Sequence, residues 1–186
     1  MRSTLDMQRL RNRTATVDEH IRGENRHDLD AVMATFGVEA HYDDEPWNDH
    51  RTGRDGVRSY YGELMRAVPD LAIDVRERHV ASEAIVVEVT IHGTHLGAWR
   101  GLPATGRRIE VPLCGIYAFG DDDKLTRERI YYDRAAVLAQ LGLFHDPTRR
   151  SGRVATALSH PVSIARAYGR RLFGRPGARP RPDEGR

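Results

Sequence analysis

The spacing of the apolar residues changes at Leu71, and this change limits the possible fold more than any other feature of the sequence. Before Leu71 the apolar residues recur at helical spacing, whereas after it they alternate with polar residues. Alternation is typical of strands that are buried on one face. The segments 84–95, 107–120 and 125–133 continue the pattern after short turns. Short connections join antiparallel neighbours, so we expect an antiparallel, strongly curved sheet.

Helix signals occupy the part of the chain before this sheet. The motif TVDE fits a capping box with its N-cap at Thr16, and Asp28 is placed to cap a second helix that continues to Phe36. A third helix is predicted to begin near Arg54 and to end at Pro69. We therefore expect three helices before any long strand and one short helix after the sheet. This order predicts an α+β architecture in which helices cover one face of the sheet.

The charge of the chain separates a body from a tail. Residues 146–186 hold ten arginines and three acidic residues, although the formal net charge of the whole chain is only +2. The tail is rich in Arg, Gly and Pro, and from Gly174 onwards its composition cannot form a core. A basic amphipathic helix is possible at 161–173. We expect one domain over 1–145, followed by a partly disordered, solvated or loosely docked tail.

What the sequence lacks excludes several classes of protein. No run approaches the roughly 18 apolar residues of a membrane span, and no secretory signal is recognisable, so we expect a cytoplasmic location. Cys114 is the only cysteine, which excludes an internal disulfide and a thiolate zinc cluster. We expect it to be a small core residue. The motifs of nucleotide-binding loops, nucleophile elbows and zinc proteases are absent.

Four segments resemble the SnoaL-like polyketide cyclase group of the NTF2-like superfamily. The turn GLPATGR and the segment DRAAVLAQLGL, in this order and spacing, are the most specific parts of the likeness, which covers about residues 16–143. The segments are HDLDAVMATFGVEAHYDD, GRDGVRSYYGELMRAVPDL, HGTHLGAWRGLPATGRRIEV and YYDRAAVLAQLGL.

The resemblance implies a cone, in which a curved antiparallel sheet wraps around long helices and leaves a deep, mostly apolar pocket. It also implies homodimers formed through the outer face of the sheet. In the cyclases an aspartate near the end of the last strand removes a proton from a carbon between carbonyls, and an aldol ring closure follows without metal or organic cofactor. Asp133 matches that aspartate, because it immediately precedes the helix that ends in QLGL. The same position also suits an N-cap.

Two histidines lie close together on the second predicted strand. His95 has the same parity as Ile91 and should point to the interior, whereas His92 should point outward. Side chains on opposite faces cannot bind one metal ion together, so we predict no metal site here. His95 is either a donor or proton-exchanging group for a substrate, or a hydrogen-bonded residue of the pocket wall. Gly93 leaves open a bulge that would reset the parity.

Aromatic and acidic residues complete the predicted site. The parity of its strand turns Tyr117 inward, as a donor to substrate or as part of a structural hydrogen bond. Tyr42, Asp44, Trp99 and Tyr131 are predicted to bind substrate. A solvated loop is the alternative for the polar residues of HYDDEPW, and DDDK is most simply a turn.

The sequence therefore predicts a cofactor-free cyclase or isomerase that acts on a hydrophobic, oxygenated small molecule. Asp133 would be the base, and His95 and Tyr117 would donate hydrogen bonds to the developing enolate. The alternatives are another NTF2-like enzyme, such as an epoxide hydrolase, a ketosteroid-isomerase-like enzyme or a hydroxylase, and a ligand-binding protein without catalysis. The expected partner is a second copy of the chain. No nucleic acid is expected, and contact of the tail with a membrane surface is a less favoured alternative.

Overall fold

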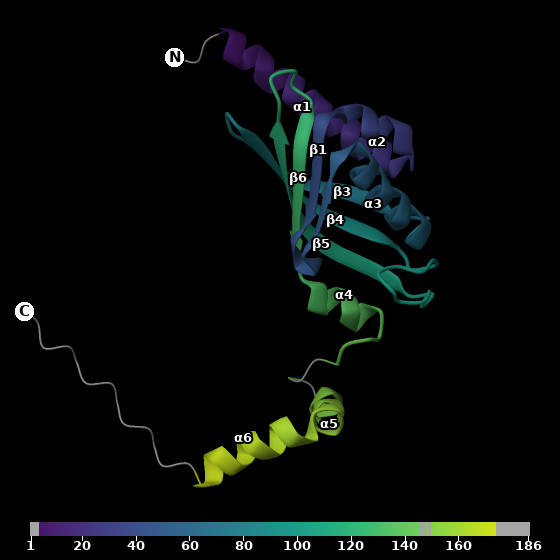
Figure 1. The fold of residues 1–186 in the computed structure, drawn as a ribbon, viewed down its shortest axis with the longest axis vertical. Helices are drawn as coiled ribbons and strands as arrows, with labels where there is room; N and C mark the ends of the chain where they lie inside the picture. Colours follow the sequence, from purple (N-terminus) through teal and green to yellow (C-terminus); the bar gives the residue numbers. More distant parts are fainter. Residues whose placement is uncertain (1–3, 146–147, 149, 174–186) are drawn as a thin grey trace, which may run out of the picture. The chain divides into compact units, whose positions relative to one another are not determined.

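The computed structural model describes residues 4–145, 148 and 150–173. The chain divides into two compact units, residues 1–144 and 145–186. Helices and strands of the larger unit gather around one curved, unclosed sheet (Figure 1). This arrangement confirms the predicted α+β class.

The sheet has six strands in the order β2-β1-β6-β5-β4-β3. All neighbouring strands are antiparallel except β1 and β6, which are parallel. The four strands predicted from the alternation after Leu71 are all present, as β3 to β6. The bounds are β1 (Phe36–Asp44), β2 (Asp49–Thr52), β3 (Ala72–Val80), β4 (Ala84–Thr94), β5 (Arg108–Phe119) and β6 (Leu125–Tyr132).

Two expectations about the first part of the chain are wrong. The nine-residue strand β1 lies between α2 (Leu29–Thr35) and α3 (Gly53–Ala67), so three helices do not precede the first long strand. The helix α1 runs over Thr4–Asn25, so Thr16 is not an N-cap. Its hydroxyl donates to the carbonyl of Asn12 within the helix. Asp28 does cap α2, because its side chain accepts a hydrogen bond from the amide of Ala31 at 3.0 Å.

The helices α1, α2 and α3 lie against one face of the sheet, and the core forms between them (Figure 1). Side chains from α1 and α3 meet the inward residues of β4 and β5 there. The short helix α4 (Arg134–Gln140) follows β6 and packs against β5. Fully buried members of this core are Val17, Tyr61, Val57 and Val87, with Tyr117 nearly so.

The register between β4 and β5 decides which way the two histidines point. Pairing is continuous from Ala84 opposite Ala118 to Thr94 opposite Arg108, so Gly93 marks no bulge. Gly93 is required for close approach instead, because a Cβ there would lie 2.2 Å from Cγ1 of Val68. The predicted inward parity of His95 is therefore correct.

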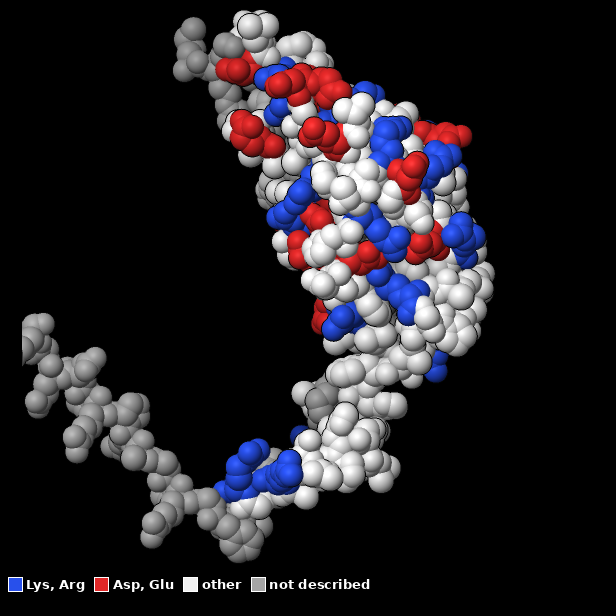
Figure 2. All heavy atoms as spheres, viewed as in Figure 1, with Lys and Arg blue, Asp and Glu red and all other residues white. Residues whose placement is uncertain are grey.

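The outward face of the sheet carries Cys114, which contradicts its prediction as a core residue. Cys114 is half-buried, because it alternates with inward-facing neighbours on β5. Its outward neighbours across the strands are Glu88 and Tyr131. Lys and Arg side chains are interspersed with Asp and Glu over the visible face of the larger unit (Figure 2).

The described residues of the smaller unit form two helices, α5 (Arg150–Ser159) and α6 (Pro161–Phe173). The helix predicted at 161–173 is present. Large apolar side chains are exposed on both helices, among them Leu158 and Val162. The prediction for the segment from Gly174 onwards lies outside the described residues. In the described part of the chain, no helix is both long enough and apolar enough to cross a membrane.

Candidate active site

An apolar cavity lies between the helices and the inward face of the sheet. The space between atoms in and around it is about 840 Å³, a figure that includes open solvent at its mouth. Its predominantly apolar lining is typical of small-molecule sites. Aliphatic side chains form most of its wall, among them Leu64, Val89, Ile91, Ile109, Val111 and Leu113 of α3, β4 and β5.

Two carboxyl groups and one imidazole interrupt this apolar wall. They are Glu24 of α1, His95 after β4 and Glu128 of β6. Glu24 is 7% exposed, Glu128 is 3% exposed and His95 is 1% exposed. Buried ionisable groups in a cavity are costly unless they are paired, so their partners indicate what each group can do.

Glu24 and Glu128 belong to a buried cluster around His20, which we call the floor cluster. Its members are Glu24, Glu128, His20, Tyr61 and Tyr117. Glu24 follows His20 by four residues in α1, and four residues place two side chains on one helix face. His20 Nε2 lies 3.1 Å from Glu128 Oε2 and 3.5 Å from Glu24 Oε2. The hydroxyls of Tyr61 and Tyr117 donate hydrogen bonds to Glu128.

Burial is the main cause that raises the pKa of Glu24 to about 8; the charge of His20 opposes the rise and that of Glu128 adds to it. Burial alone would lower the pKa of His20, but the charges of Glu128 and Glu24 outweigh this effect and raise it. Burial also keeps the pKa values of Tyr61 and Tyr117 well above the usual range, so both remain protonated donors. Glu24 is therefore a carboxyl group that exchanges its proton near neutral pH.

A second buried cluster surrounds Asp44 at the end of β1. Asp44 Oδ2 accepts hydrogen bonds from the hydroxyls of Tyr60 at 3.0 Å and Tyr132 at 3.3 Å, and from Arg100 Nη2 at 2.6 Å. Arg100 also binds Asp49 at 2.8 Å. Burial raises the pKa of Asp44, and Arg100 and the two hydroxyls oppose the rise. The hydroxyls of these two cavity-lining tyrosines are thus already engaged.

Arg100 lies in a tight turn that places Trp99 beside the cavity. Trp99 and Leu102 exchange two backbone hydrogen bonds, and Arg100 has a φ of 53°, in the left-handed region. The guanidinium of Arg100 lies 5.0 Å from the ring centre of Trp99 and 5.1 Å from that of Trp47. Cation–π contact and the ion pairs to β1 and β2 hold the turn against the sheet.

His95 presents an unpartnered nitrogen at the cavity wall. Its Nδ1 lies 3.1 Å from the Thr105 hydroxyl, while Nε2 is buried and has no hydrogen-bond partner among the described residues. Burial lowers the pKa of His95, so the ring is neutral at pH 7. A neutral imidazole in this position can exchange a hydrogen bond with a bound ligand.

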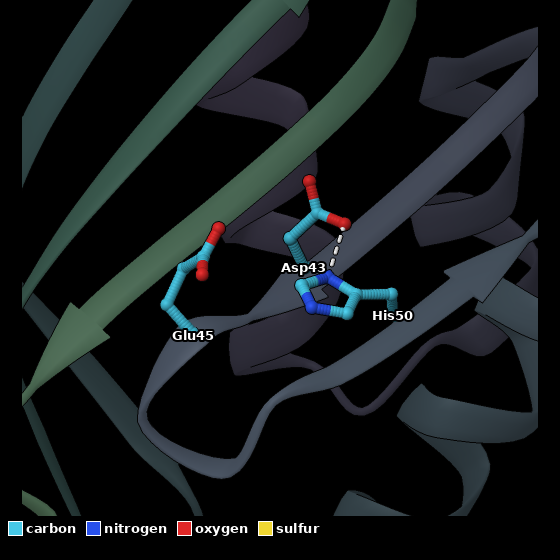
Figure 3. A group of neighbouring side chains, drawn as sticks. All are labelled: Asp43, Glu45 and His50. Carbon is cyan, nitrogen blue, oxygen red and sulfur yellow. Dashed lines mark hydrogen bonds and ion pairs between the residues drawn. The ribbon is translucent and has the colours of Figure 1, made fainter.

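Two groups of described side chains outside the cavity have the composition of a cation site; one is exposed and consists of Glu77, His79 and Glu88. In the other, Asp43, Glu45 and His50 converge from β1, the following turn and β2 (Figure 3). Asp43 pairs with His50 Nδ1 at 2.9 Å and with Arg127 at 3.2 Å, and Glu45 pairs with Arg129 at 3.2 Å. Because arginines already neutralise both carboxylates, the group fits a network of ion pairs better than a metal site.

The comparisons with known proteins agree with this geometry. Residues 14–141 match the family model described as SnoaL-like polyketide cyclase. The chain belongs to this family. No functionally curated protein sequence matches it.

Solved structures share the fold of this SnoaL-like chain. IdmH from Streptomyces antibioticus is 20% identical, with a TM-score of 0.59, and the match covers 70% of this chain and 98% of IdmH. The epoxide hydrolase/cyclase-like enzyme SalBIII, studied in pyran ring formation in the polyether salinomycin, is also 20% identical, with a TM-score of 0.59 and coverage of 68% and 94%. A protein with a ketosteroid isomerase-like fold from Catenulispora acidiphila is 19% identical, with a TM-score of 0.58 and coverage of 69% and 92%. These matches establish the fold.

Asp133, the residue that matches the aspartate of the SnoaL-like cyclases, lies outside the cavity. It is exposed and is the N-cap of α4, where it accepts hydrogen bonds from the amides of Ala135 at 2.8 Å and Ala136 at 3.1 Å. The capping role considered from the sequence is confirmed. Catalysis by Asp133 stays a prediction, and the cavity does not support it, because the carboxylate faces the end of its own helix.

The remaining predicted residues divide between the cavity and other surroundings. Tyr42, Trp99, His95 and Tyr117 line the cavity. Tyr131 is 44% exposed and alternates with the two inward residues beside it on β6, so it faces away from the cavity.

The alternative of a solvated loop for HYDDEPW is wrong at its acidic positions. Asp43 is 6% exposed and Asp44 is fully buried. Arginines pair with both carboxylates, and two tyrosine hydroxyls bind Oδ2 of Asp44, whereas its Oδ1 has no partner among the described residues. Asp44 acts on the cavity through the tyrosines that it binds, and it does not line the cavity itself.

Sequence reasoning missed His20, Glu24 and Glu128. Glu128 has the same parity as the inward residues Ile130 and Tyr132, and this parity could have placed its carboxylate in the interior. The spacing of four between His20 and Glu24 was available too, but only the length of α1 shows that both lie on a helix facing the sheet.

Proposed function

We propose that this SnoaL-like chain is an enzyme that removes a proton next to a carbonyl group of a hydrophobic, oxygenated small molecule, and thereby promotes ring closure or isomerisation. The observation that carries the proposal is Glu24, a carboxyl group with a pKa of about 8 in the wall of an apolar cavity. General bases work best when their pKa lies near the working pH. Membership of the SnoaL-like polyketide cyclase family supports the same class of reaction.

The proposed reaction begins with ionised Glu24. Its carboxylate takes a proton from the carbon beside the carbonyl, and the electron pair of the broken C–H bond forms an enolate. The Thr105 hydroxyl can donate to Nδ1 of His95, which leaves the hydrogen on Nε2 to bind the enolate oxygen. Such a donor stabilises the charge that develops during the reaction.

Two outcomes of the enolate conserve all atoms and charges. In an aldol closure, the enolate carbon forms a bond to a second carbonyl carbon of the same molecule, and Glu24 returns its proton to the new alkoxide. In an isomerisation, Glu24 returns the proton to a different carbon. The reaction as written needs neither metal nor cofactor, and the apolar wall excludes water that would compete for the enolate.

The test uses a probe ketone, because proton removal can be measured without the natural substrate. 2-Tetralone deuterated beside its carbonyl is incubated with the full chain in ordinary water, and loss of deuterium is followed by NMR. We expect the wild-type chain to accelerate the exchange and Glu24→Gln to lower the rate by about 10²- to 10⁴-fold, the usual contribution of a general base.

Glu19→Gln is the matched control. Glu19 lies on the same helix, is exposed and pairs with Arg22 and Arg26, so its loss should leave the exchange rate unchanged. Circular dichroism of each variant establishes that it is folded. Exchange by folded Glu24→Gln at the wild-type rate would contradict the proposal.

Epoxide hydrolysis is the second candidate function, and the cluster around Asp44 favours it. Asp44 has one buried carboxylate oxygen, Oδ1, without a partner among the described residues. It could accept a proton from a water molecule that attacks an epoxide; donation to the epoxide oxygen would require Tyr60 or Tyr132 to turn its hydroxyl away from Asp44 Oδ2. Styrene oxide in ¹⁸O-labelled water tests this. Diol formation that requires Asp44 and tolerates Glu24→Gln would replace the first proposal.

A further inference from the structure

Beneath the cavity, the fully buried side chain of His20 has both ring nitrogens directed at hydrogen-bond acceptors. We propose that His20 is a permanent imidazolium and a positioning residue: it holds Glu128 as a carboxylate and leaves Glu24 as the carboxyl group that exchanges protons with a neutral carbonyl substrate. This assignment of roles rests on the function proposed above. The charge state of His20 itself does not.

The hydrogen bond to Thr35 shows whether Nδ1 of His20 carries a hydrogen. His20 Nδ1 lies 2.8 Å from the Thr35 oxygen. The hydroxyl hydrogen of Thr35 is donated elsewhere, to the carbonyl of Val32 at 2.6 Å. A hydroxyl has only one hydrogen to donate, so Thr35 must accept from His20. Nδ1 therefore carries a hydrogen.

The Nε2 side meets three oxygen atoms, from Glu128 at 3.1 Å, Glu24 at 3.5 Å and Tyr61 at 3.0 Å. Tyr61 donates its hydrogen to Glu128 in the shorter contact, so its oxygen can only accept from the ring. A bare Nε2 lone pair would face the Glu128 carboxylate and be repelled by it. Nε2 therefore carries a hydrogen as well, and a ring with hydrogens on both nitrogens is positively charged.

The neighbours of His20 come from every element packed around it. Glu24 lies on α1, Thr35 on α2, Tyr61 on α3, Tyr117 on β5 and Glu128 on β6. Phe36 of β1 meets the ring by its edge at 5.5 Å between centroids. Arg78 of β3 also acts electrostatically on this region, and its guanidinium is paired with Asp18. The two carboxyl groups are thus the acidic groups in contact with the ring.

One cation beside two carboxyl groups explains why Glu128 is ionised whereas Glu24 keeps its proton. Glu128 receives hydrogen bonds from Tyr61 and Tyr117 and lies closer to His20, so it is the better-stabilised anion. The negative charge of Glu128 disfavours a second one on Glu24, whose proton is retained up to about pH 8. The resting floor cluster is then neutral overall.

This charge balance also defines the substrate class. A substrate carboxylate beside Glu128 would place two negative charges together in an apolar cavity, which is costly. A neutral ketone or aldehyde avoids this cost. When ionised Glu24 removes the proton, negative charge moves from Glu24 to the enolate oxygen, while His20 and Glu128 keep their charges.

The charge of His20 can be measured without any substrate. The full chain labelled with ¹⁵N is titrated from about pH 6 to about pH 9, and both ring nitrogens are followed through their coupling to the ring protons. We expect His20 to keep the signals of an imidazolium above pH 7, beyond the ordinary pKa of about 6.5 of a histidine side chain. Glu128→Gln, which removes the main counter-charge, should lower the pH at which His20 loses its proton. His20→Gln assigns the signals. Neutral His20 at pH 7 would overturn the proposal.

The probe reaction gives a second readout, which a merely structural role would not change. Glu128→Gln leaves Glu24 alone with the imidazolium, so the pH at which exchange reaches half its maximum should move below the wild-type value. His20→Gln removes the cation and should move it above that value. If His20→Gln does not fold, the pH profile of exchange by Glu128→Gln alone tests the positioning role of His20. An unchanged profile in folded Glu128→Gln would overturn the positioning role, whereas inactivity of the wild-type chain would overturn only the proposed function.

Discussion

Glu24 and Glu128 have the same functional group and line the same cavity, but their neighbours give them different properties. Two tyrosine hydroxyls and His20 stabilise Glu128 as an anion. Among the described residues, Glu24 forms an ion pair with His20 at 3.5 Å, and it retains its proton up to about pH 8. The burial of each carboxyl group therefore does not by itself decide its role; the hydrogen-bond donors around it do.

Glu24 should also make the stability of the chain depend on pH. Its pKa is about 8 in the folded chain and near 4.5 in the unfolded chain. Between these values the folded state binds more protons than the unfolded state, so the contribution of Glu24 to stability falls as the pH rises. Glu24→Gln does not titrate. We therefore expect the stability of Glu24→Gln relative to the wild type, measured as the difference in free energy of unfolding, to increase from about pH 5 to about pH 8.

Urea denaturation at several pH values measures this difference. Glu19→Gln again serves as the control, because Glu19 is exposed and its pKa is lowered by Arg26 and Arg22. A difference between Glu24→Gln and wild type that stays constant over the range would mean that Glu24 titrates normally.

At the scale of single elements, substitutions of Asp133 at the start of α4 distinguish its role as a helix cap from its predicted role as a catalytic base. Asparagine caps helices about as well as aspartate, whereas alanine costs about 1 kcal/mol. We expect Asp133→Asn to be stable and to exchange deuterium at the wild-type rate, and Asp133→Ala to be less stable by about that amount. Folded but inactive Asp133→Asn would instead support the base predicted from the family resemblance.

The turn from Trp99 to Leu102 depends on a buried ion pair. Arg100→Met would leave Asp44 buried without its cation, and such losses cost about 3 to 5 kcal/mol. Adding Asp44→Asn removes the uncompensated charge and should recover part of the stability. Thermal and urea unfolding of the single and double variants measure the effect. A double variant no more stable than Arg100→Met would show that the turn does not depend on this charge.

The elements differ in how well the sequence predicts them. Strands β3 to β6 alternate regularly, so the sheet and the inward direction of His95 and Tyr117 could be predicted. Strand β1 was obscured because it ends in buried polar residues, HYDD, whose partners come from α3, β6 and the turn at Arg100. The first half of α1 is mostly exposed and has no apolar stripe, so its true start could not be recognised.

The site was less predictable than the fold, for a physical reason. A glutamate in a strand is usually expected to face water, and only the combined donors from three elements make Glu128 acceptable inside. Asp133 was singled out because it stands at the family position, but an exposed N-cap has no contact with the cavity. Pairing between distant elements decides which charges are buried, and such pairing cannot be read from local spacing.

For the whole molecule, the larger unit contains everything that the proposed reaction uses. The members of the floor cluster and of the cluster around Asp44 lie between His20 and Tyr132. We therefore expect a chain ending at Phe144 to keep the melting temperature and the deuterium exchange of the full chain. Calorimetry and the 2-tetralone assay check this. Loss of exchange in the folded shorter chain would mean that the basic tail takes part in the reaction.

The proposed reaction depends most on one property of the folded chain, the pKa of Glu24. The chain is labelled with ¹³C at the side-chain carboxyl groups of glutamate, and the signal of Glu24 is assigned with Glu24→Gln. Its titration should have a midpoint near pH 8. A midpoint near the ordinary value of about 4.5 would contradict the account, because Glu24 would then be a weak, permanently ionised base.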